Sequence, residues 1–411
     1  MYTKTHVFQD IVDIISNDYA GFLDKKQINC PNNYSITDDM DEVEFVKMVQ
    51  SYLLDFKDDH LIFTKKNNTI PFKGFNVRRY EDALYVSEIQ GEERLQIGDK
   101  ILMVNGISIE AFAKENSKIL KSSVHERQAW NAVLPSIHTI RVQREVDFIE
   151  LKLKEFDKPA YVPEYSLRLL DTQTVVIKIT DFNQGEPIQQ LITDNQHMLN
   201  DAENLIIDVR VNLGGNDLFY LPLLDYMFDC PLNISELFEQ DDVMYTNYTE
   251  NNCNLRIDSL NAFLNQPIDA ETKGILENEI KKYQDFSGKG LVVHDDDMDW
   301  KINGQPSPKN VIVLTDNRCG SSGDTFVKNV KKSPKVTVIG RATMGVIDYC
   351  NIVQKDYGDY IFSYSVSKMN EKYYCNETGV LPDIHIPWTP KHVEADVDLN
   401  YALSLCKQVK I

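Results

Sequence analysis

Two stretches near the amino terminus place apolar side chains at the spacing of an amphipathic helix. In residues 5–23 one helical face carries Phe8, Ile11, Ile14 and Ile15. Residues 42–55 repeat the pattern after an aspartate-rich start, and acidic side chains suit the amino-terminal end of a helix. We therefore predict a small helical unit over residues 1–66, which ends in the sequence LDFKDDHLIF.

The pattern changes to short β-rich runs over residues 70–156. Turn-forming glycine, asparagine and aspartate separate the runs ALYVSEI, DKILMVNG, HTIRVQRE and DFIELKLKEF. We expect a turn at residues 98–99, a strand at 101–104 and a hairpin turn of the favoured kind at Asn105-Gly106. This segment is therefore predicted to form a β-rich domain of its own.

Strands and helices alternate from residue 160 to residue 411. Buried strands are expected in TVVIKITDF, NLIIDVRVNLGG, VIVLTD and KVTVIG, and an amphipathic helix is expected in TFVKNVKK. Such alternation predicts an α/β layer architecture. A polar, asparagine- and aspartate-rich stretch at about 230–305 interrupts it, and we interpret that stretch as an insertion or lid of mixed helix and loop.

Composition narrows the class of protein. A chain of 411 residues with 42% hydrophobic and 26% charged residues fits a soluble globular protein of two or three domains. The net charge of -20 argues against binding nucleic acid or anionic lipid through a broad basic face. No run of about 18 apolar residues is present, and the first residues lack the pattern of a secretory signal, so we expect neither a membrane span nor a leader.

The cysteines and the acidic runs give no sign of a metal site. The seven cysteines are odd in number and none has CxxC spacing, which favours reduced thiols in a cytoplasmic protein, with a single reactive cysteine as the open alternative. The run HDDDMDW at residues 294–300 lacks the glycine and distal glutamate of a calcium loop. We therefore expect a solvated loop there, and no metal or cofactor.

The sequence CGSSGD, at residues 319–324, joins an expected strand to an expected helix. A serine at such a joint lies beside the unpaired N–H groups of the first helical turn, which can stabilise an oxyanion. It is therefore a candidate nucleophile. The alternative is that both serines only cap the helix. The segment is not a GxSxG elbow, because Asp324 stands where that pattern needs glycine.

A second candidate segment, DVRVNLGG, follows another expected strand and ends in Gly214 and Gly215. Paired glycines let backbone N–H groups face a substrate without obstruction by a Cβ. The alternative is an ordinary tight turn. The combination D-x-R-x-N-x-G-G is much rarer than a glycine pair alone.

Taken in order, LIIDVRVNLGG, VIVLTDNRCGSSGDTF, VTVIGRATMG and ETGVLPDIHI resemble the core of the S41 serine peptidases. That family includes the C-terminal processing (tail-specific) proteases and the tricorn core protease. LQIGDKILMVNG resembles the PDZ domain that many members carry. The resemblance implies an α/β, crotonase/ClpP-like catalytic core over residues 160–411, preceded by a PDZ-like domain at 70–156 and the helical unit.

The resemblance also assigns the nucleophile. The family's serine lies three residues before an acidic residue, usually glutamate, and Asp324 takes that place here, so Ser321 matches the nucleophile. The N–H of Ser322 would join the oxyanion hole, and Gly214 or Gly215 would supply the other donor. The sequence leaves open which glycine does so.

Two ways of activating the serine are known in the family. The processing proteases use a lysine just after a G-x-x-T-x-G segment, but Val346 stands there, and a valine cannot accept a proton. Tricorn-like members use a histidine from the amino-terminal region and a late glutamate, which match His60 and Glu377. An imidazole suits proton transfer near neutral pH, and a carboxylate behind it fixes its tautomer.

The predicted function is a serine endopeptidase acting on unfolded or short polypeptides, with recognition of their C-terminus as one possibility. The departures at Asp324 and Val346 support one alternative, an inactive peptide-binding scaffold of the same fold. An acyl-CoA-handling enzyme on the similar crotonase architecture is another, and it would need no serine nucleophile. Neither the cleavage preference nor the oligomeric state follows from the sequence.

Overall fold

The chain folds into two units, and each is assembled from three separate segments. Unit 1 comprises Met1–Asn68, Phe238–Met298 and Val346–Asn376, and unit 2 comprises Thr69–Leu237, Asp299–Gly345 and Glu377–Ile411. The computed structural model describes residues 2–67, 71–265, 270–294 and 300–408. Most of the acidic run at 294–300 therefore lies outside the described residues. The three-part division expected from the sequence remains a prediction.

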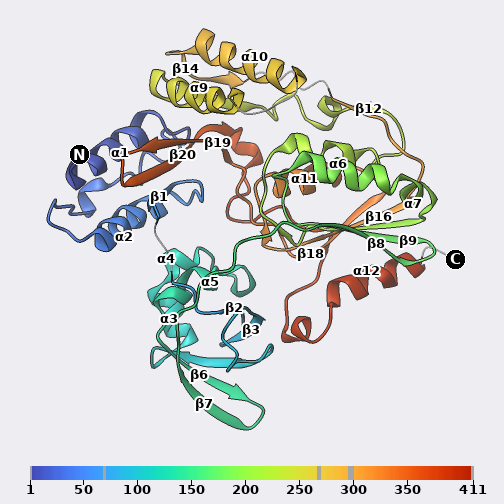
Figure 1. Ribbon diagram of the computed structural model, residues 1–411, viewed down its shortest axis with the longest axis horizontal. Coiled ribbons are helices and arrows are strands. Elements are labelled where there is room, and N and C mark those ends of the chain that lie inside the picture. Colours follow the sequence, from blue (N-terminus) through green and yellow to red (C-terminus); the bar gives the residue numbers. More distant parts are fainter. Residues whose placement is uncertain (1, 68–70, 266–269, 295–299, 409–411) are drawn as a thin grey trace. The chain divides into compact units, whose positions relative to one another are not determined.

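A six-stranded sheet forms the centre of unit 2 (Figure 1). Its order is β21-β18-β16-β10-β9-β8, parallel except for the β8–β9 pair. The strands are β8 Tyr165–Asp171, β9 Thr174–Ile179, β10 Asn204–Asp208, β16 Asn310–Thr315, β18 Val336–Gly340 and β21 Ile384–His385. These strands confirm the predicted α/β core.

Helices cover both faces of this sheet. Side chains alternate between the two faces along each strand, so each set of helices buries a different set of side chains. Side chains on one face of the sheet, such as Val313, pack against α6 (Gly185–Asp194) and α11 (Ser322–Val330). Side chains on the opposite face, such as Ile312, pack against α12 (Val397–Gln408) (Figure 1). The shorter helices of this part are α7 Gln196–Asp201 and α8 Leu221–Leu224. The central strands are therefore apolar on both sides.

The β-rich segment of unit 2 forms a second sheet, ordered β2-β3-β4-β6-β7, with β5 paired to β4. Its elements are β2 Phe75–Tyr80, β3 Ala83–Ile89, β4 Lys100–Val104, β5 Ile107–Ser108, α3 Ile109–Glu115, α4 Ser117–Leu120, α5 Trp130–Val133, β6 Thr139–Arg144 and β7 Asp147–Lys152. The expected hairpin turn is confirmed, since Asn105 and Gly106 have φ values of 48° and 79°.

Buried charges tie this β-rich domain to the α/β core. Arg78 on β2 donates to Asp316, just after β16, with an Nη2–Oδ1 distance of 3.0 Å. Asp316 also accepts from Arg341 at 2.9 Å, and Arg341 in turn pairs with Asp398 at 2.6 Å. Because Asp316 begins the loop that leads to Ser321, this network fixes one end of the candidate site.

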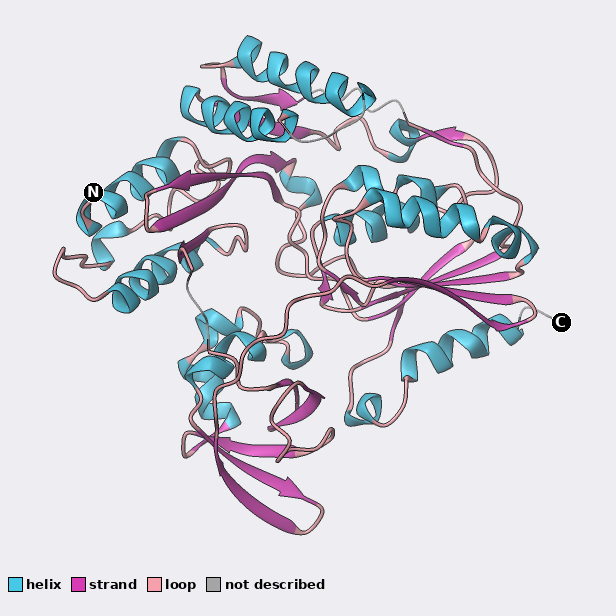
Figure 2. Ribbon diagram, viewed as in Figure 1, coloured by secondary structure: helices cyan, strands magenta, loops and turns pink. Residues whose placement is uncertain are grey.

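Unit 1 is built on a sheet ordered β1-β20-β13-β14, with β19 paired to β20. Figure 2 draws the strands of the chain in magenta and its helices in cyan. Its strands are β1 Ile62–Lys65, β13 Met244–Tyr248, β14 Gly290–His294, β19 Tyr349–Asp356 and β20 Tyr360–Met369. Helices α1 (Lys4–Asn17) and α2 (Glu42–Leu53) pack their apolar faces on this sheet. Both helices predicted from the sequence are present, but the first, expected over residues 5–23, ends at Asn17.

The stretch at about 230–305, interpreted as an insertion or lid of mixed helix and loop, contains four strands as well as helices α9 (Glu250–Leu264) and α10 (Ala270–Phe286). Besides β13 and β14, these are the short strands β12 (Leu232–Asn233) and β15 (Lys301–Ile302), which pair with each other. Strand β13 pairs with β20, more than 100 residues further along the chain. The expectation of helix and loop was therefore incomplete, because a partner so distant in sequence decides the pairing. No helix in the described part of the chain is long and apolar enough to cross a membrane.

Candidate active site

Ser321 lies on a tight turn between the central sheet and helix α11. Strand β16 ends at Thr315, the short strand β17 (Arg318–Cys319) follows, and α11 begins at Ser322. The backbone of Ser321 has φ 56° and ψ -123°, which is a strained conformation for a residue with a Cβ. Ser321 is partly exposed, whereas Ser322 and Asp324 are buried.

Other helices of this chain show that capping alone does not require such strain. The side chains of Thr3, Asp41, Ser108 and Thr249 cap α1, α2, α3 and α9, and all four residues have φ between -64° and -78°. A helix-capping residue ordinarily has this extended conformation. Ser321 also occupies the capping position, but capping does not account for its positive φ. A strained turn that presents the serine hydroxyl at the end of the sheet would account for it.

Asp324 fixes this turn from inside. Its Oδ2 accepts the Ser321 N–H at 2.7 Å, as in a capping box, and its Oδ1 accepts the Gly345 N–H at 2.8 Å. Asp324 is completely buried. One carboxylate therefore joins the Ser321 turn to the segment Gly340–Gly345, and both oxygens are used.

The glycine pair lies directly against Ser321. Strand β11 (Val211–Asn212) pairs in parallel with β17, and the Gly320 N–H donates to the Asn212 carbonyl at 2.9 Å. A Cβ on Gly214 would lie 2.6 Å from the Ser321 Cβ and 3.2 Å from its Oγ. Gly214 also has φ +76°, which favours glycine. The structure thus brings together two segments that the sequence separates by more than 100 residues.

The geometry narrows the choice of oxyanion donor. The Gly214 N–H already donates to Asn212 Oδ1 at 3.0 Å, so it is not free to bind a substrate. Among the described residues, the N–H groups of Gly215 and Ser322 have no hydrogen-bond acceptor, and Ser322 opens α11, where the first N–H groups lack helical partners. The Ser322 hydroxyl donates to the Gly215 carbonyl at 2.9 Å and so holds the two residues together.

Asp217 adds a partly exposed carboxyl close to this turn. Removal from water raises the pKa of Asp217 to about 6, and the neighbouring Ser322 side chain lowers it by a smaller amount. A carboxyl with such a pKa titrates within the range in which proteins work. In the sequence, only its position after the glycine pair points to this residue.

Glu377 lies in a loop that packs against the segment Gly340–Gly345. The Val380 N–H donates to Thr343 Oγ1 at 2.8 Å, and a Cβ on Gly379 would lie 2.0 Å from the Thr343 carbonyl oxygen. The loop is thereby anchored to the segment that Asp324 holds. The side chain of Glu377 itself is exposed.

His60 belongs to unit 1, whereas Ser321, Ser322, Gly214, Gly215 and Glu377 belong to unit 2. Its side chain is 13% exposed, and ring Nδ1 lies 3.5 Å from Asp58 Oδ1. Burial alone would lower the pKa of His60, but the carboxylate of Asp58 at ion-pair distance outweighs it, with smaller contributions from Asp59 and the Tyr349 backbone. The pKa of His60 is therefore raised.

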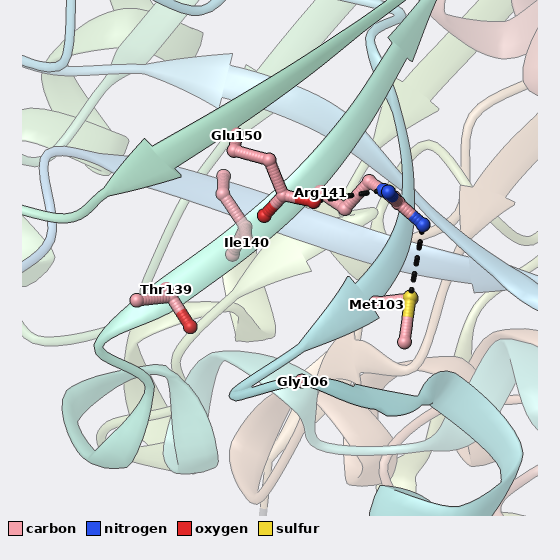
Figure 3. Close-up of a pocket in the computed structure, with 6 residues that line it drawn as sticks. All are labelled: Met103, Gly106, Thr139, Ile140, Arg141 and Glu150. Atoms are coloured by element: carbon pink, nitrogen blue, oxygen red, sulfur yellow. Dashed lines mark hydrogen bonds and ion pairs between the residues drawn. The ribbon is translucent and has the colours of Figure 1, made fainter.

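A small cavity of about 250 Å³ lies in the β-rich domain, lined by Met103, Gly106, Thr139, Ile140, Arg141 and Glu150 (Figure 3). Arg141 Nε pairs with Glu150 at 2.8 Å, so its charge is already neutralised. The cavity therefore offers a peptide carboxylate no unpaired cation. Within the described residues, no cluster of three or more histidine, cysteine, aspartate or glutamate side chains is arranged to hold a metal ion.

Comparison with known proteins bears on the family and the fold of this chain. A model of peptidase family S41 matches residues 173–386, more than half of the chain. The fold is similar to mature CPAF complexed with lactacystin, with a TM-score of 0.69 and 15% identity over 99% of this chain and 98% of that chain. A protein from Parabacteroides merdae, described as a candidate peptidase, has a TM-score of 0.52 and 15% identity over 99% and 97% of the two chains.

A search of curated protein sequences found no match. The similarity to the solved structures, at 15% identity, shows the fold. The matched family segment contains the glycine pair, the Ser321 turn and Glu377. This chain therefore belongs to peptidase family S41 and is a serine-type peptidase.

Proposed function

We propose that this peptidase cleaves internal peptide bonds of unfolded or short polypeptides through an acyl-enzyme on Ser321, with His60 as general base. The backbone of Ser321 carries this proposal, because φ 56° and ψ -123° differ from those of every side-chain-capped α-helix start described above. Strain of this kind is characteristic of functional sites.

The first step is attack of Ser321 Oγ on the scissile carbonyl carbon, while the hydroxyl proton passes to His60. The imidazolium then gives that proton to the leaving amine, and the acyl-enzyme forms. Water repeats the sequence and releases the new carboxyl terminus. A positioned general base contributes on the order of 10²–10⁴ in rate. Because His60 and Ser321 belong to different units, the proposal requires both units for activity.

The N–H groups of Gly215 and Ser322 are proposed to bind the oxyanion of the tetrahedral intermediate. Gly214 is then a spacer rather than a donor, because its N–H is bound to Asn212. One donor of this kind is worth roughly 3–4 kcal/mol of transition-state stabilisation. The Ser322–Gly215 hydrogen bond keeps the two donors in a fixed relation before substrate arrives.

Glu377 is proposed, on the family resemblance, to support the imidazole of His60. Recognition of a substrate's C-terminus by the β-rich domain is a further part of the proposal and rests on the same resemblance. Neither a metal nor another cofactor is needed for the steps above. We expect a cytoplasmic site of action, because the seven cysteines are odd in number and none has CxxC spacing.

A fluorophosphonate probe tests the assignment without knowledge of the substrate. We expect the wild type to be labelled, the modified peptide to carry the adduct on Ser321, and labelling to disappear in Ser321→Ala. In His60→Ala we expect the rate of labelling to fall by about 10²–10⁴. An inert wild type would favour the peptide-binding scaffold, and substrate turnover retained in Ser321→Ala would favour a reaction without a serine nucleophile.

A further inference from the structure

The carboxylate of Asp58 is held at the Nδ1 edge of the His60 ring. Asp58 Oδ1 accepts the backbone N–H of His60 at 2.9 Å, which is an Asx turn, and the same oxygen lies 3.5 Å from Nδ1. The separation of Asp58 Oδ1 and His60 Nδ1 is that of an ion pair and is longer than a hydrogen bond. Among the described residues, Nδ1 has no hydrogen-bond partner. The turn therefore fixes which ring nitrogen the carboxylate faces.

The carboxylate of Asp58 makes few other interactions that would stabilise its negative charge. Its side chain is 1% exposed, and within the described part of the chain its Oδ2 is buried without a hydrogen-bond partner. A buried carboxylate without a counter-charge is costly. Protonated His60 is the only cationic side chain at ion-pair distance from Asp58 among the described residues. The carboxylate is therefore best compensated when the imidazole carries a proton.

The other titratable side chains around Asp58 and His60 come from separate parts of the chain. Tyr19 follows α1, and burial, then the charge of Asp58, hold the pKa of its phenol well above the usual range. Tyr349 begins β19 beside the buried Asp348, whose pKa burial raises, and Lys25 lies 5.5 Å from the Tyr349 ring centroid. Asp59 is the remaining charge that acts on His60. None of the other groups reaches Nδ1 within hydrogen-bond distance in the described structure.

We propose that Asp58 is the positioning carboxylate of His60: it holds the Nδ1 proton and stabilises the imidazolium, so that Nε2 accepts the proton of Ser321. This inference rests on the proposed function for its catalytic meaning. A neutral imidazole has one N–H group. If Asp58 holds it, no ring nitrogen remains for Glu377, and the two carboxylates compete for one role.

The alternative is that Asp58 only forms the Asx turn. Asp58→Asn separates the two roles, because the asparagine carbonyl can accept the His60 N–H while the charge is lost. Asp59→Asn is the matched control, since it removes the neighbouring charge without touching Nδ1. Glu377→Gln tests the competing carboxylate with the same loss of charge.

The first experiment measures the rate of fluorophosphonate labelling against pH. For Asp58→Asn we expect a rate about ten- to a thousandfold lower at neutral pH, with the acid limb displaced to lower pH because removing the carboxylate lowers the pKa of His60. Asp59→Asn should remain within about threefold of wild type, and Glu377→Gln, which removes the carboxylate that the family resemblance assigns to the same role, should lose less rate than Asp58→Asn. A wild-type profile in Asp58→Asn, or the expected loss in Glu377→Gln instead, would overturn the inference.

The second experiment does not depend on activity. Nitrogen-15 NMR of labelled histidines, with His60 assigned through His60→Gln, reports its tautomer and its pKa. We expect the Nδ1–H tautomer in the neutral wild type, and a lower His60 pKa in Asp58→Asn. An Nε2–H tautomer in the wild type would reject the inference, even if Asp58→Asn failed to fold. If the wild type were not labelled but the NMR result held, the proposed function would fail and the Asp58–His60 contact would stand.

Discussion

Gly214 and Ser321 are packed so closely that no side chain fits between them. A Cβ on Gly214 would lie 2.6 Å from the Ser321 Cβ, and the Gly320 carbonyl oxygen would lie at 2.9 Å. Both neighbours belong to a turn that hydrogen bonds hold rigidly, so neither can withdraw easily. Van der Waals contact, together with φ +76°, makes glycine necessary at this position.

Gly214→Ala should therefore damage both stability and the reactivity of Ser321. We expect a loss of about 2–4 kcal/mol in the free energy of unfolding, from the strained φ and the overpacking. Fluorophosphonate labelling should slow by at least about tenfold. Urea denaturation and labelling kinetics measure the two effects. Gly274→Ala in α10 is the control, because no atom lies within 4 Å of its added Cβ, and it should stabilise the protein by about 0.5–1 kcal/mol.

Asp324→Asn should loosen the turn that presents Ser321. The carboxylate accepts two backbone N–H groups, and an amide offers only one oxygen, so one donor would face an NH₂ group. We expect a cost of about 1–3 kcal/mol in stability and slower labelling of Ser321.

The same substitution at another helix start provides the comparison for Asp324→Asn. Asp41 caps α2 by accepting the Glu44 N–H at 2.8 Å. Asparagine caps helices as well as aspartate does, so Asp41→Asn should change stability by less than about 0.5 kcal/mol. Equal losses in the two variants would contradict the role given to Asp324.

Asp217→Asn should stabilise the protein at neutral and alkaline pH. Folding raises the pKa of Asp217 to about 6 through burial, so its contribution is favourable in acid and is lost as pH rises from about 4 through 6. Since Asp217 is partly exposed, we expect a gain of only about 1 kcal/mol at pH 8 that shrinks towards pH 4. Denaturation midpoints at both pH values test this, and a gain independent of pH would contradict it.

Arg341→Met should leave two buried carboxylates without their shared counter-ion. Burial alone would raise the pKa of Asp316, but Arg78 and Arg341 outweigh it and hold it well below its usual range. Breaking a buried pair of this kind costs about 3–5 kcal/mol. The loss should be greatest at neutral pH and should shrink progressively as pH falls from about 4 through the depressed pKa values of Asp316 and Asp398, because wild type loses the same stabilisation over that range.

An exposed ion pair gives the reference for Arg341→Met. Arg141 pairs with Glu150 at 2.8 Å on the surface of the β-rich domain, with side chains 46% and 68% exposed. Exposed pairs contribute about 0–1 kcal/mol, so Arg141→Met should have little effect on thermal unfolding. A comparable loss in both variants would show that burial of the Arg341 network does not matter to its strength.

The sequence by itself determined the repeating elements and the order of the motifs. Short apolar runs in β10 and β16 and helical spacing in α1 and α2 depend on neighbours within a few positions, so these elements could be predicted. The strand–turn–helix setting of Ser321 and the glycine pair were visible for the same reason. Strands β13 and β14 were missed, because their pairing depends on a distant partner.

The tertiary structure alone decided how the candidate groups are used. Asn212 occupies the Gly214 N–H and so leaves Gly215 as the candidate oxyanion donor, a choice that the sequence left open. The strain at Ser321 and the burial of Asp58 against His60 likewise became visible only in the folded chain. Hydrogen bonding and burial depend on which atoms folding brings together, and contacts between segments more than 100 residues apart leave no local pattern in the sequence.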